Sequence, residues 1–351
     1  MQLIQYATSF MAISQLLFMA LFYLVYYRRQ LLGRLMAFYA VCLIGYILST
    51  LPEVDSGPWS LNLALGILAV SAPAVLWVVT RYLFEDDPKV DPVIWVGIVL
   101  YIGLSFVGNV TGVQDGWGYW LHSFVPLVAM LGLAFHVVYT AVTGLGTDLV
   151  EPRRELRVPF AITMGTIVAM IVGSYFLNLT ERWIFNLYIG VIFLFILFFN
   201  LVSFRVHRDS PQLIDPVVSS PQAVPPHNGR VSDNDKDKPL IDRIHAVMEN
   251  DRLYAQHGLT IGQLAASASV QEYRLRRLIN QKLHYRNFNQ YLNQYRIAEA
   301  ARRLQDPAET HLPISTIALD VGYASLSSFN KAFKEAHGVT PSIFRSRAPQ
   351  A

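Results

Sequence analysis

Long apolar runs separated by short polar connections fill the first 210 residues of this chain. Most of these runs reach the roughly 20 residues that a helix needs to cross a bilayer. A backbone in hydrocarbon must satisfy its own hydrogen bonds, and the alternating pattern of a barrel is absent, so the runs predict helices. We expect a seven-helix transmembrane domain over residues 1–209, with spans at residues 3–27, 35–51, 59–84, 92–111, 119–144, 158–180 and 183–204.

The placement of positive charge predicts the orientation of these spans. With the N-terminus outside, the inner connections hold ten Lys and Arg residues, whereas the outer connections hold only Arg182. Cytoplasmic loops carry the excess of Lys and Arg, so this bias puts the C-terminus in the cytoplasm. Arg28 and Arg29 directly follow a long first run that has no basic N-region, which predicts a signal anchor rather than a cleaved signal peptide.

The apolar period disappears between residues 210 and 239. Six prolines interrupt this stretch, and Asp, Asn, Ser and Gly fill the spaces between them. Proline breaks helices, and a polar segment of this composition cannot bury enough apolar surface to fold. We therefore expect a disordered linker at residues 210–239.

Short amphipathic helices follow from residue 240. Thr260 with Gln263 three residues later has the pattern of a capping box, which predicts a helix start. After a short turn, a third helix is expected at residues 271–282, with Leu275, Leu278 and Ile279 facing inward. A helix, a short turn and then a basic helix is the helix-turn-helix pattern.

The same pattern repeats after a long helix. That helix is expected at residues 287–305, where Asp306–Pro307 ends it. A short helix then ends at Gly322, which suits a left-handed turn, and a second basic helix is expected at residues 325–336. The positions expected to be buried in the long helix are Phe288, Tyr291, Leu292, Tyr295, Ala298 and Leu304.

Composition and charge agree with two different halves. Charged residues make up 15% of the chain, against about 25% in a typical soluble domain. Residues 240–351 hold 14 Lys and Arg against 9 Asp and Glu, which favours a nucleic-acid partner for this part. The single cysteine, Cys42, excludes an internal disulfide framework. Residues 1–210 contain no HExxH, GxSxG or Cys/His metal cluster, so we expect neither an enzyme, a metal site nor a cofactor.

In the order and spacing of its motifs, the C-terminal part resembles the AraC/XylS family of bacterial transcription regulators. The resemblance covers roughly residues 240–347, which we expect to form a DNA-binding domain in an all-α protein. It is carried by the segments Tyr295–Ala300, Ile317–Tyr323, Ser328–Lys334 and Gly338–Arg345. The membrane half is unlike the cupin-type sensor of the best-known members of the family.

The resemblance implies two recognition helices in successive major grooves, separated by the long helix as a spacer. In the first recognition helix, Tyr273, Arg276 and Arg277 match positions that approach bases or phosphates. In the second, Leu326, Ser327 and Lys331 match such positions. Arg274 and Lys334 are expected at phosphates, and Asn330 lies on the same outward face. For each of these residues a solvated surface position is the alternative.

Three departures from the family pattern affect this expectation. Gln271 lies where the family often has a serine cap, and His284 lies where a glycine often turns the chain, so strain is expected at that turn. Leu326 is apolar and could contact only a thymine methyl group or the DNA backbone. The second helix is therefore expected to contribute less base specificity than the first.

Polar residues within the predicted spans are candidate functional groups. His122 and His136 lie 14 residues apart in the fifth span, within about 40° of one helical face. Hydrogen bonding between helices is the favoured reading for these histidines, and a pocket for a small ligand is the alternative. A row of small residues at positions 161, 165, 169 and 173 is read as packing within the bundle, with a dimer seam as the alternative.

These observations predict a sequence-specific transcription regulator embedded in a bacterial inner membrane. We expect a one-component sensor-regulator that acts as an activator, with promoter DNA, the lipid bilayer and RNA polymerase as partners. A homodimer and an unidentified small ligand or membrane partner belong to the same hypothesis. Two alternatives remain: a passive membrane anchor controlled by another membrane protein, and a transporter-like sensor with a DNA-binding feedback domain.

Overall fold

The computed structural model describes residues 2–51, 59–86, 88, 91–111, 116–176, 182–209 and 237–347. The chain divides into two compact units. One comprises Met1–Leu145 and Pro152–Val218, and the other comprises Gly146–Glu151 and Ser219–Ala351. Most of the predicted linker, residues 210–236, lies outside the described residues.

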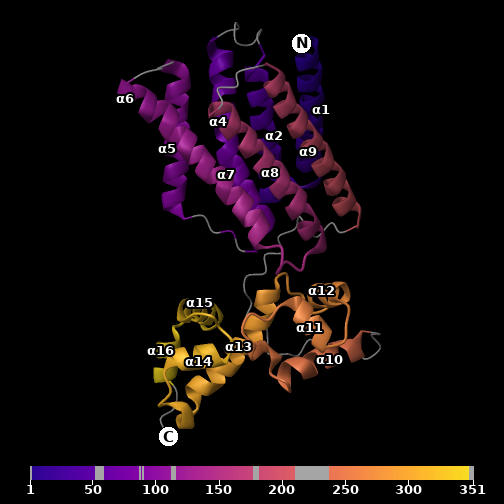
Figure 1. The fold of residues 1–351 in the computed structure, drawn as a ribbon, viewed down its shortest axis with the longest axis vertical. Coiled ribbons are helices and arrows are strands. Elements are labelled where there is room, and N and C mark those ends of the chain that lie inside the picture. The colour runs from indigo at the N-terminus through magenta and orange to yellow at the C-terminus, as the bar shows by residue number, and fades with distance from the viewer. Residues whose placement is uncertain are drawn as a thin grey trace. The chain divides into compact units, whose positions relative to one another are not determined.

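The first unit is a bundle of long helices drawn in indigo to magenta and rose in Figure 1. Each predicted apolar run falls on a helix, as far as the run is described. The fifth run forms three successive helical segments, α6, the π-helical turn η1 and α7. The elements are α1 (Gln2–Tyr26), α2 (Leu31–Ser49), α4 (Trp59–Phe84), α5 (Pro92–Thr111), α6 (Gly116–Tyr119), η1 (Trp120–Phe124), α7 (Val125–Thr143), α8 (Glu151–Phe176) and α9 (Arg182–Asp209).

The packing of this unit follows its apolar faces. Helix α2 packs on α1 and α4, α1 also packs on α9, and α4 also packs on α5 and α7. Polar side chains also join some of these helices. Tyr23 in α1 shares a 3.0 Å hydrogen bond with Ser203 in α9. Asn200 in α9 also donates to the carbonyl oxygen of Gln15 in α1, at 3.2 Å. These contacts agree with hydrogen bonding between helices as the role of polar residues in the bundle.

Within the described residues, five helices are long and apolar enough to cross a membrane. They are Leu3–Tyr26, Leu31–Ser49, Trp59–Phe84, Gly116–Thr143 and Leu187–Phe204. The apolar helix Pro92–Gly108 is shorter. Helix α8 begins with a charged turn that holds Arg153, Arg154 and Arg157.

Arg157 ties the ends of three helices together inside this first unit. It is 2% exposed, and it donates hydrogen bonds to the carbonyl oxygens of Thr140 at 2.8 Å and Ala141 at 3.1 Å in α7. It also donates to the carbonyl oxygen of Phe84, at 2.7 Å. The last carbonyl groups of a helix lack partners within the helix, so one buried guanidinium satisfies the C-terminal ends of both α4 and α7.

The second unit is built from short helices around two hydrophobic cores. The first core contains Leu264, Leu275 and Ile279, and the second contains Ile317, Phe329 and Phe333. The elements are α10 (Lys238–Glu249), η3 (Leu253–Ala255), α11 (Ile261–Ser267), α12 (Glu272–Gln281), α13 (Phe288–Gln305), η4 (Pro307–Glu309), α14 (Ile314–Asp320), α15 (Leu326–His337) and α16 (Pro341–Ser346).

Helix α13 belongs to both cores. Its first turns contribute Phe288 and Leu292 to the first core, and its last turns contribute Ile297 and Leu304 to the second. With 18 residues it is about 27 Å long at 1.5 Å per residue. The prediction of burial was wrong at Ala298, which is exposed. The expected spacer helix is therefore present, and it also joins the two cores.

Local signals in the sequence determine several helix ends in this unit. Thr260 and Gln263 form the predicted capping box, and α13 ends at Gln305, directly before Asp306–Pro307. Gly322 adopts the predicted left-handed turn, with φ of 98°. His284 has φ of 61°, which confirms the expected strain where the family often has glycine. Gln271 makes no side-chain cap to α12, in line with its departure from serine.

The segment Gly146–Glu151, which connects α7 to α8 along the chain, belongs to the second unit. Leu149 is 3% exposed and is part of the first core. Its amide donates to the carbonyl oxygen of Arg286 at 3.0 Å, and the amide of Phe288 donates to the carbonyl oxygen of Thr147 at 2.9 Å. Asp148 and Asn287 therefore form an isolated antiparallel bridge. No pattern in the amino-acid sequence predicts this contact.

Candidate nucleic-acid interface

Helices α12 and α15 lie toward the two ends of α13, on the same edge of the second unit in Figure 1. Each is the second helix of a helix-turn-helix motif, after α11 and α14 respectively. The predicted inward residues of α12, Leu275, Leu278 and Ile279, are at most 3% exposed. The apolar stripe fixes each helix against its core and leaves the opposite face for other contacts.

The outward face of α12 presents polar and aromatic groups, as predicted. Tyr273 is 53% exposed, and Arg274 and Arg277 are also exposed. Arg274 lies 3.1 Å from Asp237 in an exposed ion pair, and the Nε of Arg277 donates to Gln281 at 2.9 Å. Exposed pairs of this kind contribute little to stability. Both guanidinium groups can therefore exchange these partners for phosphates or bases.

Arg276 is the exception on α12, because its expected exposure on the outward face is wrong in this structure. It is 8% exposed. Its Nε and Nη2 donate to Glu272 Oε1 at 2.9 and 2.6 Å. Its Nη1 donates to the carbonyl oxygen of Asp148 at 3.0 Å, and Nη2 also donates to that of Gly146 at 3.2 Å. The helical period gave the face correctly, but Gly146–Glu151 covers that face.

The second recognition helix is open along its outward face. Phe329 and Phe333 are fully buried and anchor α15. Ser325 caps the helix, because its hydroxyl accepts the amide of Ser328 at 3.2 Å. The predicted contact residues are all exposed, namely Leu326, Ser327, Asn330, Lys331 and Lys334.

Arg296 in α13 was not recognised as important from the sequence. Its Nε donates to the carbonyl oxygen of Tyr254 at 2.8 Å and its Nη2 to that of Gln256 at 3.1 Å. Its guanidinium lies 5.5 Å from the ring centre of Tyr323. Burial lowers the pKa of Arg296 and raises that of Tyr323. This arginine connects the loop after α10 to the turn of the second motif, and so fixes the two recognition helices relative to each other.

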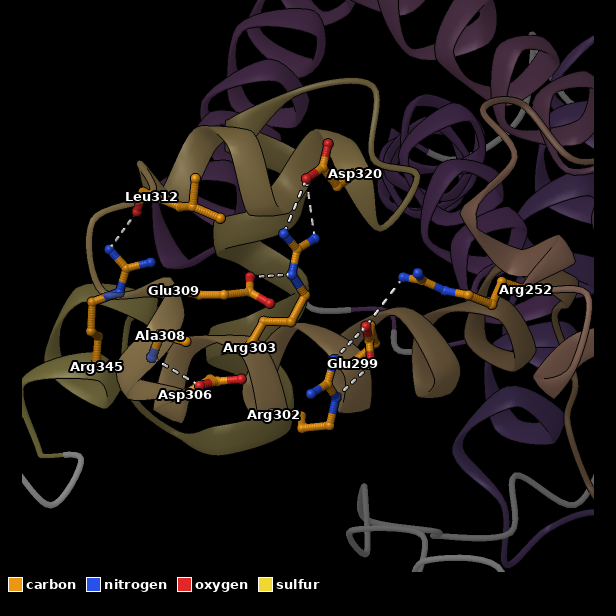
Figure 2. Close-up of polar contacts among 10 residues, drawn as sticks. All are labelled: Arg252, Glu299, Arg302, Arg303, Asp306, Ala308, Glu309, Leu312, Asp320 and Arg345. Atoms are coloured by element: carbon orange, nitrogen blue, oxygen red, sulfur yellow. Dashed lines mark hydrogen bonds and ion pairs between the residues drawn. The ribbon is translucent and has the colours of Figure 1, made fainter. Parts of the chain in front are cut away.

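Ion pairs surround the same junction on its exposed side (Figure 2). Arg303 pairs with Glu309 at 2.6 Å and with Asp320 of α14 at 3.1 Å. Glu299 accepts from Arg302 and Arg252, and its hydrogen bond with Arg302 lowers the pKa of its carboxyl group. This network holds α13 against the elements before and after it.

The two histidines predicted as candidate functional groups, His122 and His136, contact different helices. Nδ1 of His136 in α7 accepts from Trp77 of α4 at 3.1 Å, and it lies 3.2 Å from the hydroxyl of Thr140. His122 lies in η1, beside Gly108 of α5, and its Nδ1 has no hydrogen-bond partner among the described residues. Among the residues that the structure describes, no group of three His, Cys, Asp or Glu could hold a metal ion.

Comparison with known proteins agrees with two helix-turn-helix motifs. Residues 264–347 match the family described as a helix-turn-helix domain. Regulatory protein SoxS of Salmonella typhimurium is 32% identical over 89 residues, which are 25% of this chain and 79% of SoxS. No solved structure shows a significant match to the chain.

The second unit thus defines a helix-turn-helix DNA-binding protein. The chain belongs to the AraC family of transcription regulators, which are DNA-binding proteins and not enzymes. The family match at residues 264–347 lies within the second unit, and the helices of the first unit lie outside it.

Proposed function

We propose that this protein is a membrane-embedded, sequence-specific transcription regulator of promoter DNA. The observation that carries the proposal is that one chain combines five helices apolar enough to cross a bilayer with an AraC-type DNA-binding domain. The proposed domains are a seven-span membrane domain at residues 1–209, a linker at 210–239 and the DNA-binding domain at 240–347. The proposed location is the bacterial inner membrane, with the DNA-binding domain in the cytoplasm.

The membrane topology has a direct test. Cys42 is the single cysteine, so a Cys42→Ser background allows one new cysteine to be placed in each connection and labelled from either side of spheroplasts. Arg28→Cys is expected to react only when the inner side is opened, and Thr180→Cys from the outside. The reverse pattern at these two positions would contradict the proposed orientation.

DNA binding is tested with the full chain in lipid nanodiscs. Duplexes are selected from a random-sequence pool, and the affinity for the selected sequence is compared with that for scrambled DNA at fixed salt. A specific regulator is expected to prefer its selected sequence by at least about a thousandfold. Equal affinity for both duplexes would contradict sequence-specific regulation.

The contact residues are proposed on the outward faces of α12 and α15. Arg276 and Arg277 are assigned to bases, since arginine pairs bidentately with guanine. Arg274 and Lys334 are assigned to phosphates. The remaining proposed contacts are Tyr273, Leu326, Ser327, Asn330 and Lys331. Exposure supports this assignment for every residue except Arg276.

The first unit is proposed to sense a signal at the membrane or in the periplasm, through a small ligand or a membrane partner. We further propose that the protein is an activator, which would bring RNA polymerase to the promoter, and that it acts as a homodimer. The test of sensing removes residues 1–209 and compares promoter activity with and without the natural stimulus, once the stimulus is found from the neighbouring genes. Control that survives this deletion would favour regulation by a separate partner protein.

A further inference from the structure

The segment Gly146–Glu151 occupies the surface of the first helix-turn-helix motif that presents Arg276. It is held there by backbone pairing on both sides of the Asp148–Asn287 bridge and by Leu149, which is 3% exposed in the first core. A loop that only passed by would not bury an apolar side chain and align two backbone hydrogen bonds. The contact is therefore a specific docking of one segment of the chain on its DNA-binding domain.

Docking engages the hydrogen-bond donors that Arg276 would need for DNA. A guanidinium has five N–H donors and no acceptor. Glu272 accepts from Nε and Nη2, and the carbonyl oxygens of Asp148 and Gly146 accept from Nη1 and Nη2. Bidentate pairing with guanine needs two of these donors on one side of the fork. Arg276 cannot make that pairing while the segment is docked.

We infer that Gly146–Glu151 is an autoinhibitory strap that withholds Arg276 from DNA. This inference rests on the proposed function of α12 as a recognition helix. The strap begins three residues after Thr143, the last residue of α7, and its own last residue, Glu151, is the first of α8. A signal that changes the spacing or orientation of these two helices would pull the strap away and release Arg276.

The neighbours of the strap along the chain are anchored firmly enough to transmit such a movement. Arg157 in α8 bonds the C-terminal carbonyl groups of α7 and α4. Arg153 in α8 pairs with Asp86, which follows α4, at 2.9 Å. A side chain on Gly144 would collide with the Arg157 guanidinium, at 2.4 Å. These contacts join the ends of α4, α7 and α8, which flank the strap. A movement of these helices would therefore move both ends of the strap.

A reversible disulfide tests the inference. Asp148 and Asn287 form a pair flanked by hydrogen bonds rather than joined by them, so their Cα atoms are about 4.5 Å apart, within the range that a disulfide spans. The protein carries Asp148→Cys and Asn287→Cys in a Cys42→Ser background, so this pair is its only cysteines. The full chain in nanodiscs is oxidised, and its affinity for a duplex selected with the reduced protein is measured before and after reduction.

The oxidised protein is expected to bind the selected duplex about tenfold or more weaker than the same protein after reduction. Each single-cysteine variant, treated identically, should show no change, which excludes an effect of the oxidant. Equal or tighter binding in the oxidised form would overturn the inference, and so would failure of the two cysteines to link. If the reduced protein selects no duplex at all, the proposed DNA-binding function is contradicted. The inference about the strap, which rests on that function, is then contradicted too.

Discussion

Arg296 lies over the ring of Tyr323, with 5.5 Å between the guanidinium carbon and the ring centre. The two residues come from the long helix α13 and from the turn of the second helix-turn-helix motif. The hydroxyl of Tyr323 also donates to Asn293 of α13, at 3.0 Å. Because Arg296 bonds the carbonyl oxygens of Tyr254 and Gln256 at the same time, it sets the angle between the two motifs.

Replacing Arg296 with alanine is expected to destabilise the second unit by about 2–3 kcal/mol, because the buried carbonyl group of Tyr254 and the part-buried one of Gln256 lose their partner. Arg302→Ala is the matched control, since Arg302 is on the same helix with 61% of its side chain exposed, and it should change stability by less than about 1 kcal/mol. The measurement is the urea midpoint for unfolding of the C-terminal unit in the full chain. Pulse proteolysis cleaves the unfolded unit, and a C-terminal epitope detects the fraction that stays intact. Similar midpoints for the two variants would rule out this role for Arg296.

Gly322→Ala is expected to be more damaging than Gly338→Ala. Both glycines have positive φ, 98° and 73°, so both alanines carry the strain of the left-handed region, about 1–2 kcal/mol. A side chain at position 322 would also meet the carbonyl oxygen of Tyr254 at 2.8 Å, whereas position 338 has open space. The same urea midpoint should therefore fall further for Gly322→Ala. Equal losses would show that the close contact with Tyr254 has no cost.

His284→Gly is expected to stabilise the turn after α12 by about 0.5–1 kcal/mol. His284 is exposed, with φ of 61°, and glycine adopts this conformation without a Cβ penalty. His284→Ala is the control, because it removes the imidazole and keeps the strain. A gain in urea midpoint that appears in both variants would assign it to the lost imidazole rather than to the backbone.

Arg277→Ala and Lys334→Ala should affect DNA binding in different ways. Loss of a base contact at Arg277 is expected to cost about 1–3 kcal/mol on the selected duplex and much less on scrambled DNA. Loss of a phosphate contact at Lys334 should weaken binding to both duplexes equally and reduce the salt slope by about 1. Titrations at several salt concentrations give both quantities. Uniform loss with Arg277→Ala would reassign this residue to a phosphate.

Arg157→Ala is expected to destabilise the first unit by about 2–3 kcal/mol, since the carbonyl groups that it satisfies at the ends of α4 and α7 lose their donor. Arg154→Ala is the control from the same turn of α8, because Arg154 is only half-buried. All six tryptophans lie before residue 210, so the thermal midpoint of tryptophan fluorescence in nanodiscs reports on this unit. An unchanged midpoint for Arg157→Ala would show that these bonds are dispensable.

Local patterns predicted much of the second unit because the forces behind them are local. The capping box at Thr260 and the left-handed turn at Gly322 depend on a few neighbouring residues, and both are present. The buried stripe of α12 follows from one helix meeting one core. Helix α13 packs against two cores with different faces. A prediction based on one apolar stripe along the helix therefore placed Ala298 in the interior, where it is exposed, and missed the buried Arg296.

The amino-acid sequence by itself determined the helices, the two motifs and the residues available to contact DNA, because helical period, caps and apolar length act over one or two turns. Only the tertiary structure decided which of those residues are accessible. Gly146–Glu151 lies more than 120 residues before Arg276 along the chain, and the groups that accept from Arg276 there are backbone carbonyl oxygens, which every residue carries. A local sequence pattern does not predict a contact over that distance. The contact changes Arg276 from an exposed group into a buried one.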